Sequence, residues 1–186
     1  MALFVAGMIS LPLWAGGIPI EGSDDKRATE QQAKTLIQQF AGQLKPKLKE
    51  AMEQGGSVHA IEVCATAAPE IATRLSAQSG WRITRVSSGN RNPDASPDEW
   101  EAAVIKTFES RLVQGADPES LEQGEITPEG YRFAKAQIAE PLCLSCHGQN
   151  IAPEVKKAIA AHYPGDRATG YEAGDIRGIF SLIKVQ

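Results

Sequence analysis

Two cysteines and a histidine stand close together in the run PLCLSCHGQ, residues 141–149. Cys143 and Cys146 are separated by two residues, and His147 follows the second cysteine directly. The three side chains therefore lie within one short segment and can bind the same group. Any fold of this 186-residue chain has to leave room beside that segment for the group that they bind.

The spacing Cys-x-x-Cys-His is the pattern by which a c-type haem is attached covalently to a protein. The two thiols form thioether bonds with the two vinyl groups of the porphyrin, and the adjacent histidine presents its imidazole to the iron. We therefore predict one covalent haem c in this protein. Cys143 and Cys146 are its expected attachment residues, and His147 is an expected axial ligand of the iron.

Two other chemistries use paired cysteines, and both fit this sequence less well. A structural zinc site needs four ligands, and the remaining cysteine and histidines, Cys64, His59 and His162, form no second paired cluster. A redox-active dithiol favours a helix start, which lowers the pKa of its first thiol. Here Pro141 stands shortly before Cys143, and the next expected helix begins only near Pro153.

The second axial position of the iron is left open by the motif itself. Cys64 lies on an apolar helical stripe, where it could equally be a small buried hydrophobic residue. A free thiol close to haem iron is prone to oxidation unless it serves as a ligand. Beyond the first twenty residues, His59, His162 and Met52 also carry a suitable donor atom, and each has an ordinary structural interpretation.

Three arginines are candidates for binding the two propionate groups of a haem. Arg82 and Arg85 lie on one expected strand, and Arg91 lies in the loop that follows it. Guanidinium groups pair with carboxylates in a bidentate geometry. The alternative is an ordinary charged surface, because exposed arginine is common.

The first twenty residues, MALFVAGMISLPLWAGGIPI, carry no charged side chain. Such a stretch is typical of an export signal peptide or of a membrane anchor, and a segment packed on the domain is the third alternative. Haem c is attached outside the cytoplasm, so this segment and the cysteine motif both favour an extracytoplasmic location, the periplasm or the thylakoid lumen. Residues 1–20 could also hold the protein at a membrane.

The rest of the chain predicts a single α+β domain over residues 29–186, preceded by a linker at 21–28. The expected helices run from Thr29 to Gly55, from Ser57 to Gly80, from Ser96 to Gly115 and from 153 to 162. The expected strands are 81–86, 131–139 and 175–185. Helices that precede strands in this way indicate an antiparallel sheet flanked by helices.

The charge balance argues against nucleic acid as a partner. The net charge is −4, and no run of lysine and arginine with interleaved aromatic residues is present. Binding to phosphates requires a basic face, so a mildly acidic chain of this kind is poorly suited to it.

Four segments together resemble the family of c-type-haem, PAS-like sensor domains. They are EVCATAAPEIA (62–72), RVSSGNRNPDASPDEWE (85–101), EPLCLSCHG (140–148) and YPGDRATGYEAGDIRGIFSL (163–182). Domains of that family occur alone in cyanobacterial proteins and also as the extracytoplasmic input of sensor kinases and chemoreceptors. The resemblance covers about residues 30–186, and we expect a stand-alone domain because no kinase segment follows it.

The resemblance implies a PAS-like antiparallel sheet with a long N-terminal helix. It also implies an iron held by the motif histidine and by a cysteine of the first segment, which are His147 and Cys64 here. We therefore expect a monohaem cytochrome that acts in electron transfer or redox sensing with an unidentified redox partner protein. The alternative is a haem-based sensor in which a gas or small molecule displaces Cys64. With both axial positions filled, we do not expect an enzyme.

Overall fold

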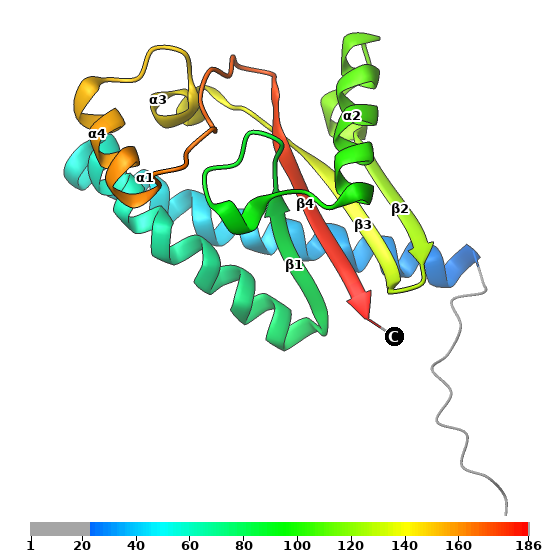
Figure 1. Ribbon diagram of the computed structural model, residues 1–186. Coiled ribbons are helices and arrows are strands. Elements are labelled where there is room, and N and C mark those ends of the chain that lie inside the picture. Colours follow the sequence, from blue (N-terminus) through cyan, green and yellow to red (C-terminus); the bar gives the residue numbers. More distant parts are fainter. Residues whose placement is uncertain (1–22, 186) are drawn as a thin grey trace, which may run out of the picture.

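A computed structural model describes residues 23–185, so the expected signal or anchor segment at 1–20 lies outside the described residues. Its centre is a four-stranded antiparallel sheet in the spatial order β1-β4-β3-β2 (Figure 1). The strands are β1 (Trp81–Val86), β2 (Glu122–Thr127), β3 (Gly130–Ile138) and β4 (Ile176–Val185). The α-helices are α1 (Ser23–Ser79), α2 (Glu99–Val113), α3 (Leu144–His147) and α4 (Pro153–His162).

The expected α+β class is confirmed, with an antiparallel sheet flanked by helices and a long N-terminal helix. The strand at 81–86 and the helix at 153–162 have the expected bounds. Three short 3-10 turns complete the described chain: η1 (Pro93–Ala95), η2 (Pro118–Ser120) and η3 (Pro141–Cys143). None of the helices within residues 23–185 is both long enough and apolar enough to span a membrane.

The long helix α1 is interrupted in its middle by two glycines. Gly55 and Gly56 have non-helical backbone angles, and Gly56 has a φ of 67°, a conformation that favours glycine. The chain turns at this break, and the two halves of α1 lie beside one another (Figure 1). Arg74 in the second half donates a hydrogen bond to Gln43 in the first half, which ties the two halves together.

The start of α1 differs from the expected start at Thr29. The helix begins at Ser23, inside the segment 21–28 that we expected to be a linker. Acidic residues in the first turn favour this start because they complement the helix dipole, and Asp24 and Asp25 occupy that turn. Thr29 is buried inside the helix and does not cap it.

The two faces of the sheet pack against different helices. The face toward α1 buries Phe40, Ile71, Trp81, Phe133 and Leu182 in one apolar cluster. The face toward α2 buries Val104, Phe108, Leu121, Ala134 and Ile179 in another. Each large apolar side chain buried in this way contributes about 1.5–3 kcal/mol, so these clusters fix which side of each strand faces which helix.

Strand β2 was not expected from the sequence EQGEIT. It is a partly exposed edge strand that pairs only with β3, so it lacks the apolar alternation of a buried strand. A Cβ at Gly124 would collide with the Tyr131 hydroxyl, so glycine at this position leaves room for that side chain. That hydroxyl donates a hydrogen bond to the Glu30 carboxylate at 2.7 Å, which joins α1 to the sheet.

Helix α2 starts at Glu99 and is capped by Asp98, later than the expected cap at Ser96. The Asp98 carboxylate accepts a hydrogen bond from the Glu101 amide, and the Glu101 carboxylate accepts one from the Asp98 amide, each at 2.8 Å. This reciprocal arrangement is a capping box, which satisfies two backbone amides at the helix start. A box at Asp98 therefore takes precedence over a single cap at Ser96.

Candidate functional site

The motif residues 143–147 lie at the end of the molecule where α3 and α4 meet the break in α1 (Figure 1). Cys146 packs against an apolar cluster formed by Ile61 of α1 with Val155 and Ile159 of α4. The Ser57 hydroxyl, just after the α1 break, lies beside the Cys146 sulfur. The motif thus packs against the second half of α1, which follows the break.

The local fold of the motif places its three functional side chains on one side. Cys143 ends η3, and Cys146 and His147 follow in the single turn of α3. Residues three and four apart on a helical turn are neighbours on its surface, so both face the same region as Cys143. Gly148 ends the turn, and a side chain there would crowd the Leu144 carbonyl oxygen at 2.6 Å.

The imidazole of His147 is held in one orientation by a backbone carbonyl. Its Nδ1–H donates a hydrogen bond to the Ala168 carbonyl oxygen at 2.7 Å. Because the carbonyl can only accept, the proton sits on Nδ1 and the Nε2 lone pair is left free to bind a metal. Burial lowers the pKa of His147 to about 2, and the cations Arg177 and Arg91 act in the same direction. The ring is therefore neutral at physiological pH.

Cys64 lies on the second half of α1 and faces the motif. Its thiol is half-buried and forms no disulfide, as is true of Cys143 and Cys146. Burial raises the pKa of the Cys64 thiol, while the charges of Arg85 and Arg177 act in the opposite direction. The two thiols are near enough that a negative charge on Cys146 would raise the pKa of Cys64. The structure therefore brings Cys64 together with the motif.

Arg91 lies in this region but already has partners. Its Nε donates to the Asp166 carboxylate at 2.8 Å, and its Nη2 donates to the Cys146 carbonyl at 2.6 Å. Arg91 therefore bridges the motif and the loop between α4 and β4, and it is not a free cation.

Arg85 and Arg177 are partly buried and, among residues 23–185, have no carboxylate in contact. The Arg85 guanidinium lies over the Phe40 ring, 5.0 Å from its centroid, and the Arg177 Nε is buried without a hydrogen-bond partner in the described chain. Burial lowers the pKa of both groups, that of Arg85 to about 10. Two partly buried cations without counter-charges are costly, and an anionic group beside them would reduce that cost.

Sequence reasoning missed Arg177, whose position depends on a β-bulge. Gln137 pairs with Gly178 and Ile138 pairs with Ile176, so Arg177 is an additional residue without a cross-strand partner. A bulge of this kind redirects a side chain, here toward Cys143 and Cys64, whose charges act on the Arg177 guanidinium. The available signal was the charged residue followed by glycine inside the apolar run DIRGIF.

Substitution of Gly178 by alanine is expected to destabilise the protein by about 2 kcal/mol, as backbone strain of this kind does. The added methyl group would collide with the Val86 carbonyl oxygen on the neighbouring strand. Gly42→Ala is the control, because open space surrounds Gly42 on α1 and alanine favours a helix by about 0.5–1 kcal/mol. Denaturant unfolding should show opposite signs for the two variants, and an unchanged stability in Gly178→Ala would contradict the bulge interpretation.

Arg82 lies apart from the other arginines. It alternates with Trp81 and Ile83 along β1, is 60% exposed, and faces Glu129 at 3.8 Å. Successive side chains of a strand point to opposite faces, so residues three apart, such as Arg82 and Arg85, cannot share one face. The expected grouping of these two arginines is therefore not seen.

The two remaining histidines have other surroundings. His59 contacts Glu62 on its own helix at 3.4 Å, and His162 is exposed at the end of α4. Within residues 23–185, no three side chains of the histidine, cysteine, aspartate or glutamate type gather as a metal-binding cluster.

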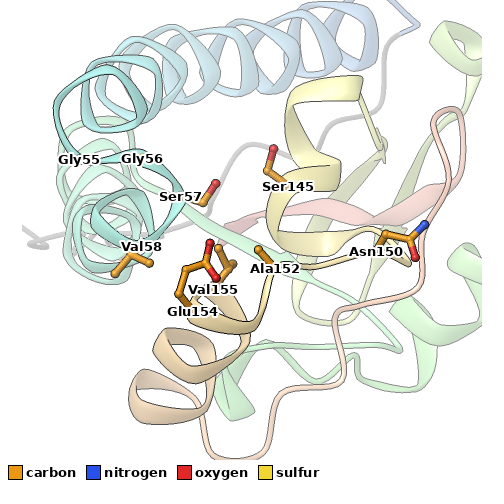
Figure 2. Close-up of a pocket in the computed structure, with 9 residues that line it drawn as sticks. All are labelled: Gly55, Gly56, Ser57, Val58, Ser145, Asn150, Ala152, Glu154 and Val155. Atoms are coloured by element: carbon orange, nitrogen blue, oxygen red, sulfur yellow. The ribbon is translucent and has the colours of Figure 1, made fainter.

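An open cavity of about 400 Å³ lies beside the motif (Figure 2). It is lined by Gly55, Gly56, Ser57 and Val58 of α1, by Ser145 of α3, and by Asn150, Ala152, Glu154 and Val155 around the start of α4. Ser57 and Ser145 lie on facing sides of it in Figure 2. Ser145 is the one motif residue that lines this cavity, and its side chain is exposed, whereas Cys143, Cys146, His147 and Cys64 are not part of the lining.

Comparison with known proteins places the chain in a family. The crystal structure of the cyanobacterial haem protein Tll0287 has the same fold, with a TM-score of 0.63 and 23% identity, covering 89% of this chain and 97% of that one. No curated protein matches the sequence. A family model described as Tll0287-like matches residues 21–184, nearly the whole chain. The chain therefore belongs to the Tll0287-like family.

Proposed function

We propose that this protein is an extracytoplasmic c-type cytochrome with one covalent haem, which acts in electron transfer or redox sensing. One observation carries the proposal: the Cys-x-x-Cys-His turn faces Cys64 and two partly buried arginines, Arg85 and Arg177, that have no carboxylate in contact among residues 23–185. Membership of the Tll0287-like family supports it, as does the fold shared with a protein described as a haem protein.

The residues present fit the covalent attachment of a haem. Cys143 and Cys146 are free thiols on adjacent turns, and His147 has its Nε2 available because Nδ1 is engaged with Ala168. When bound, the haem supplies a one-electron couple between ferric and ferrous iron. The protein supplies two tethers, a neutral imidazole in a fixed orientation, and a partly apolar wall formed by α1 and α4.

Cys64 is the proposed second axial ligand. It sits on α1 facing the motif and close to Arg85 and Arg177, whose positive charges partly offset the burial that raises the pKa of its thiol. An inert core cysteine would have apolar neighbours and full burial, whereas Cys64 is half-buried among cations. This environment supports Cys64 over the exposed His162 as the ligand.

Arg85 and Arg177 are the proposed partners of the two haem propionates. Each guanidinium is partly buried, and no carboxylate in the described chain contacts either one. A propionate would turn a costly buried cation into a charge-assisted hydrogen bond of about 1.5–3 kcal/mol. Arg91 was an equal candidate from the sequence, but its guanidinium already pairs with the Asp166 carboxylate.

A second candidate function is a haem-based sensor in which a gas or small molecule displaces Cys64. The partial exposure of Cys64 favours it, because a small molecule can reach a half-buried thiol and a neutral thiol is a poor ligand for ferrous iron. Carbon monoxide binding distinguishes the two functions. Rapid binding by the reduced protein supports the sensor, and failure to bind supports electron transfer or redox sensing. In the first function His147 and Cys64 fill both axial positions, and in the second the displacing molecule takes the place of Cys64, so we propose no catalysis at the iron.

The full chain, exported from a host that attaches c-type haem, is expected to carry one haem that stays with the polypeptide on a denaturing gel. The double variant Cys143→Ser/Cys146→Ser should lose essentially all covalent haem, because neither thioether can form. Cys64→Ser is the control and should keep the covalent haem. A wild-type protein that is purified without haem, or whose haem is extracted by acidified solvent, would contradict the proposed function.

A further inference from the structure

We propose that Arg91 and Asp166 form a positioning pair that fixes the His147 imidazole for the haem iron. The inference rests on the proposed function, because it concerns the orientation of the proposed axial ligand. Neither residue is proposed to touch the iron. Their role is to hold both the peptide turn that carries the ring and the carbonyl group that the ring hydrogen-bonds.

Asp166 fixes the acceptor of the His147 hydrogen bond. Its side chain is 10% exposed and that of Arg91 is 14% exposed, so solvent weakens their interaction little. One carboxylate oxygen of Asp166 accepts from the Arg91 Nε at 2.8 Å and from the Ala168 amide at 3.2 Å. The residue whose carbonyl accepts the imidazole proton is thereby anchored through its own amide.

Arg91 fixes the turn from which His147 projects. Its Nη2 donates to the carbonyl of Cys146, the residue before His147, at 2.6 Å. The same Nη2 lies 3.5 Å from the Ala168 carbonyl, at the limit of a hydrogen bond. A single guanidinium therefore contacts the backbone on both sides of the imidazole, and the Asp166 carboxylate holds that guanidinium in place.

The backbone around the pair supports this assignment. The Tyr171 amide donates to the His147 carbonyl at 3.0 Å, so the same loop meets α3 at a second point. The Arg167 amide donates to the Asn90 carbonyl at 3.0 Å, which joins that loop to the segment bearing Arg91. Three chain segments therefore converge on His147, and the Arg91–Asp166 ion pair joins two of them to the motif.

The expected consequence is electronic as well as structural. A strong hydrogen bond from the non-ligating nitrogen makes an imidazole a better donor to its metal. Loss of the Asp166 charge would weaken its hold on Arg91 and on the Ala168 amide, and so loosen the carbonyl that the imidazole hydrogen-bonds. The imidazole would then donate less charge, ferric iron would be less favoured, and the reduction potential would rise.

Asp166→Asn in the haem-loaded full chain tests this inference, because asparagine keeps the size of the side chain and removes its charge. We expect covalent haem to be retained, the g-values of the ferric electron paramagnetic resonance spectrum to shift or broaden, and the reduction potential to increase. Asp166→Glu, which restores the carboxylate, should move both readouts back toward those of the wild type.

The matched control is Asp98→Asn, which breaks another ion pair of arginine on the opposite side of the sheet. Arg132 donates to Asp98 at 2.7 Å there, and asparagine keeps the helix cap. Asp98→Asn should lower thermal stability without changing the spectrum or the potential. If Asp166→Asn does the same, the pair is only structural and the proposal is wrong.

Two further outcomes are informative. If Asp166→Asn does not fold, Arg91→Lys replaces it, since lysine keeps the charge but lacks the two separate nitrogens by which Arg91 binds Asp166 and the Cys146 carbonyl. An unchanged spectrum and potential in Arg91→Lys would overturn the inference. A wild-type protein without covalent haem would overturn the proposed function as well, and that result is visible before any variant is compared.

Discussion

Replacement of Cys64 by serine should remove the thiolate from the iron and leave the covalent haem in place. A serine hydroxyl stays protonated at physiological pH and is a weak ligand of iron. The covalent attachment of the haem depends on Cys143 and Cys146, which this variant keeps. A thiolate donates charge and favours ferric iron, so its loss should raise the reduction potential. The shift is expected to be on the order of 0.1 V, given that axial ligands tune haem potentials over about 0.8 V. Potentiometric titration and the ferric optical spectrum measure the effect.

Thr66→Ser is the control for Cys64→Ser, because Thr66 lies on the same part of α1 and is exposed. It should leave both the spectrum and the potential unchanged. The reduced Cys64→Ser protein should also bind carbon monoxide readily, since one axial position is then vacant or weakly held. An unchanged ferric spectrum in Cys64→Ser would mean that another residue is the ligand.

Exchange of both Arg85 and Arg177 should stabilise the haem-free protein and destabilise the haem-loaded protein. In the haem-free Cys143→Ser/Cys146→Ser background, the two guanidiniums are partly buried cations that contact no carboxylate in the described chain. Exchange of both for glutamine should stabilise that protein by about 1 kcal/mol. In the haem-loaded protein the propionates would lose their partners, at a cost of about 1.5–3 kcal/mol for each charge-assisted bond. Denaturant unfolding of both forms measures the two opposite changes in the free energy of unfolding.

The same double variant should lower the reduction potential, because two positive charges near the iron favour the ferrous form. Arg82→Gln is the matched control, since Arg82 is exposed and faces away from the site. It should change neither stability nor potential by a measurable amount. Equal destabilisation of the haem-free and haem-loaded proteins by Arg85→Gln/Arg177→Gln would show that these arginines serve the fold and not the propionates.

The sequence predicted the elements that have strong local signals. The strand at 81–86 is rich in branched and aromatic residues, and the helix at 153–162 has proline at its first position, so both were found with their observed bounds. The edge strand β2 was missed because its sequence has no apolar alternation. Its strand conformation comes from its pairing with β3. The early start of α1 was missed because a charged, polar stretch is compatible with either a linker or a helix.

The arginines show what local patterns can and cannot settle. Strand alternation already implied that Arg82 and Arg85 face opposite sides, and the structure places them so. The position of Arg177 required the register between β3 and β4, which no local pattern gives. Likewise, Arg91 and Asp166 are 75 residues apart, and their pairing is a property of the folded chain.

Electron paramagnetic resonance of the ferric wild-type protein tests the central claim most directly, since it reports spin state and axial ligation together. With His147 and Cys64 as the two ligands of a covalent haem c, the spectrum should be that of low-spin ferric iron with the small g-spread of thiolate ligation. A high-spin spectrum, or a low-spin spectrum that is the same in Cys64→Ser, would contradict His147 and Cys64 as the axial pair.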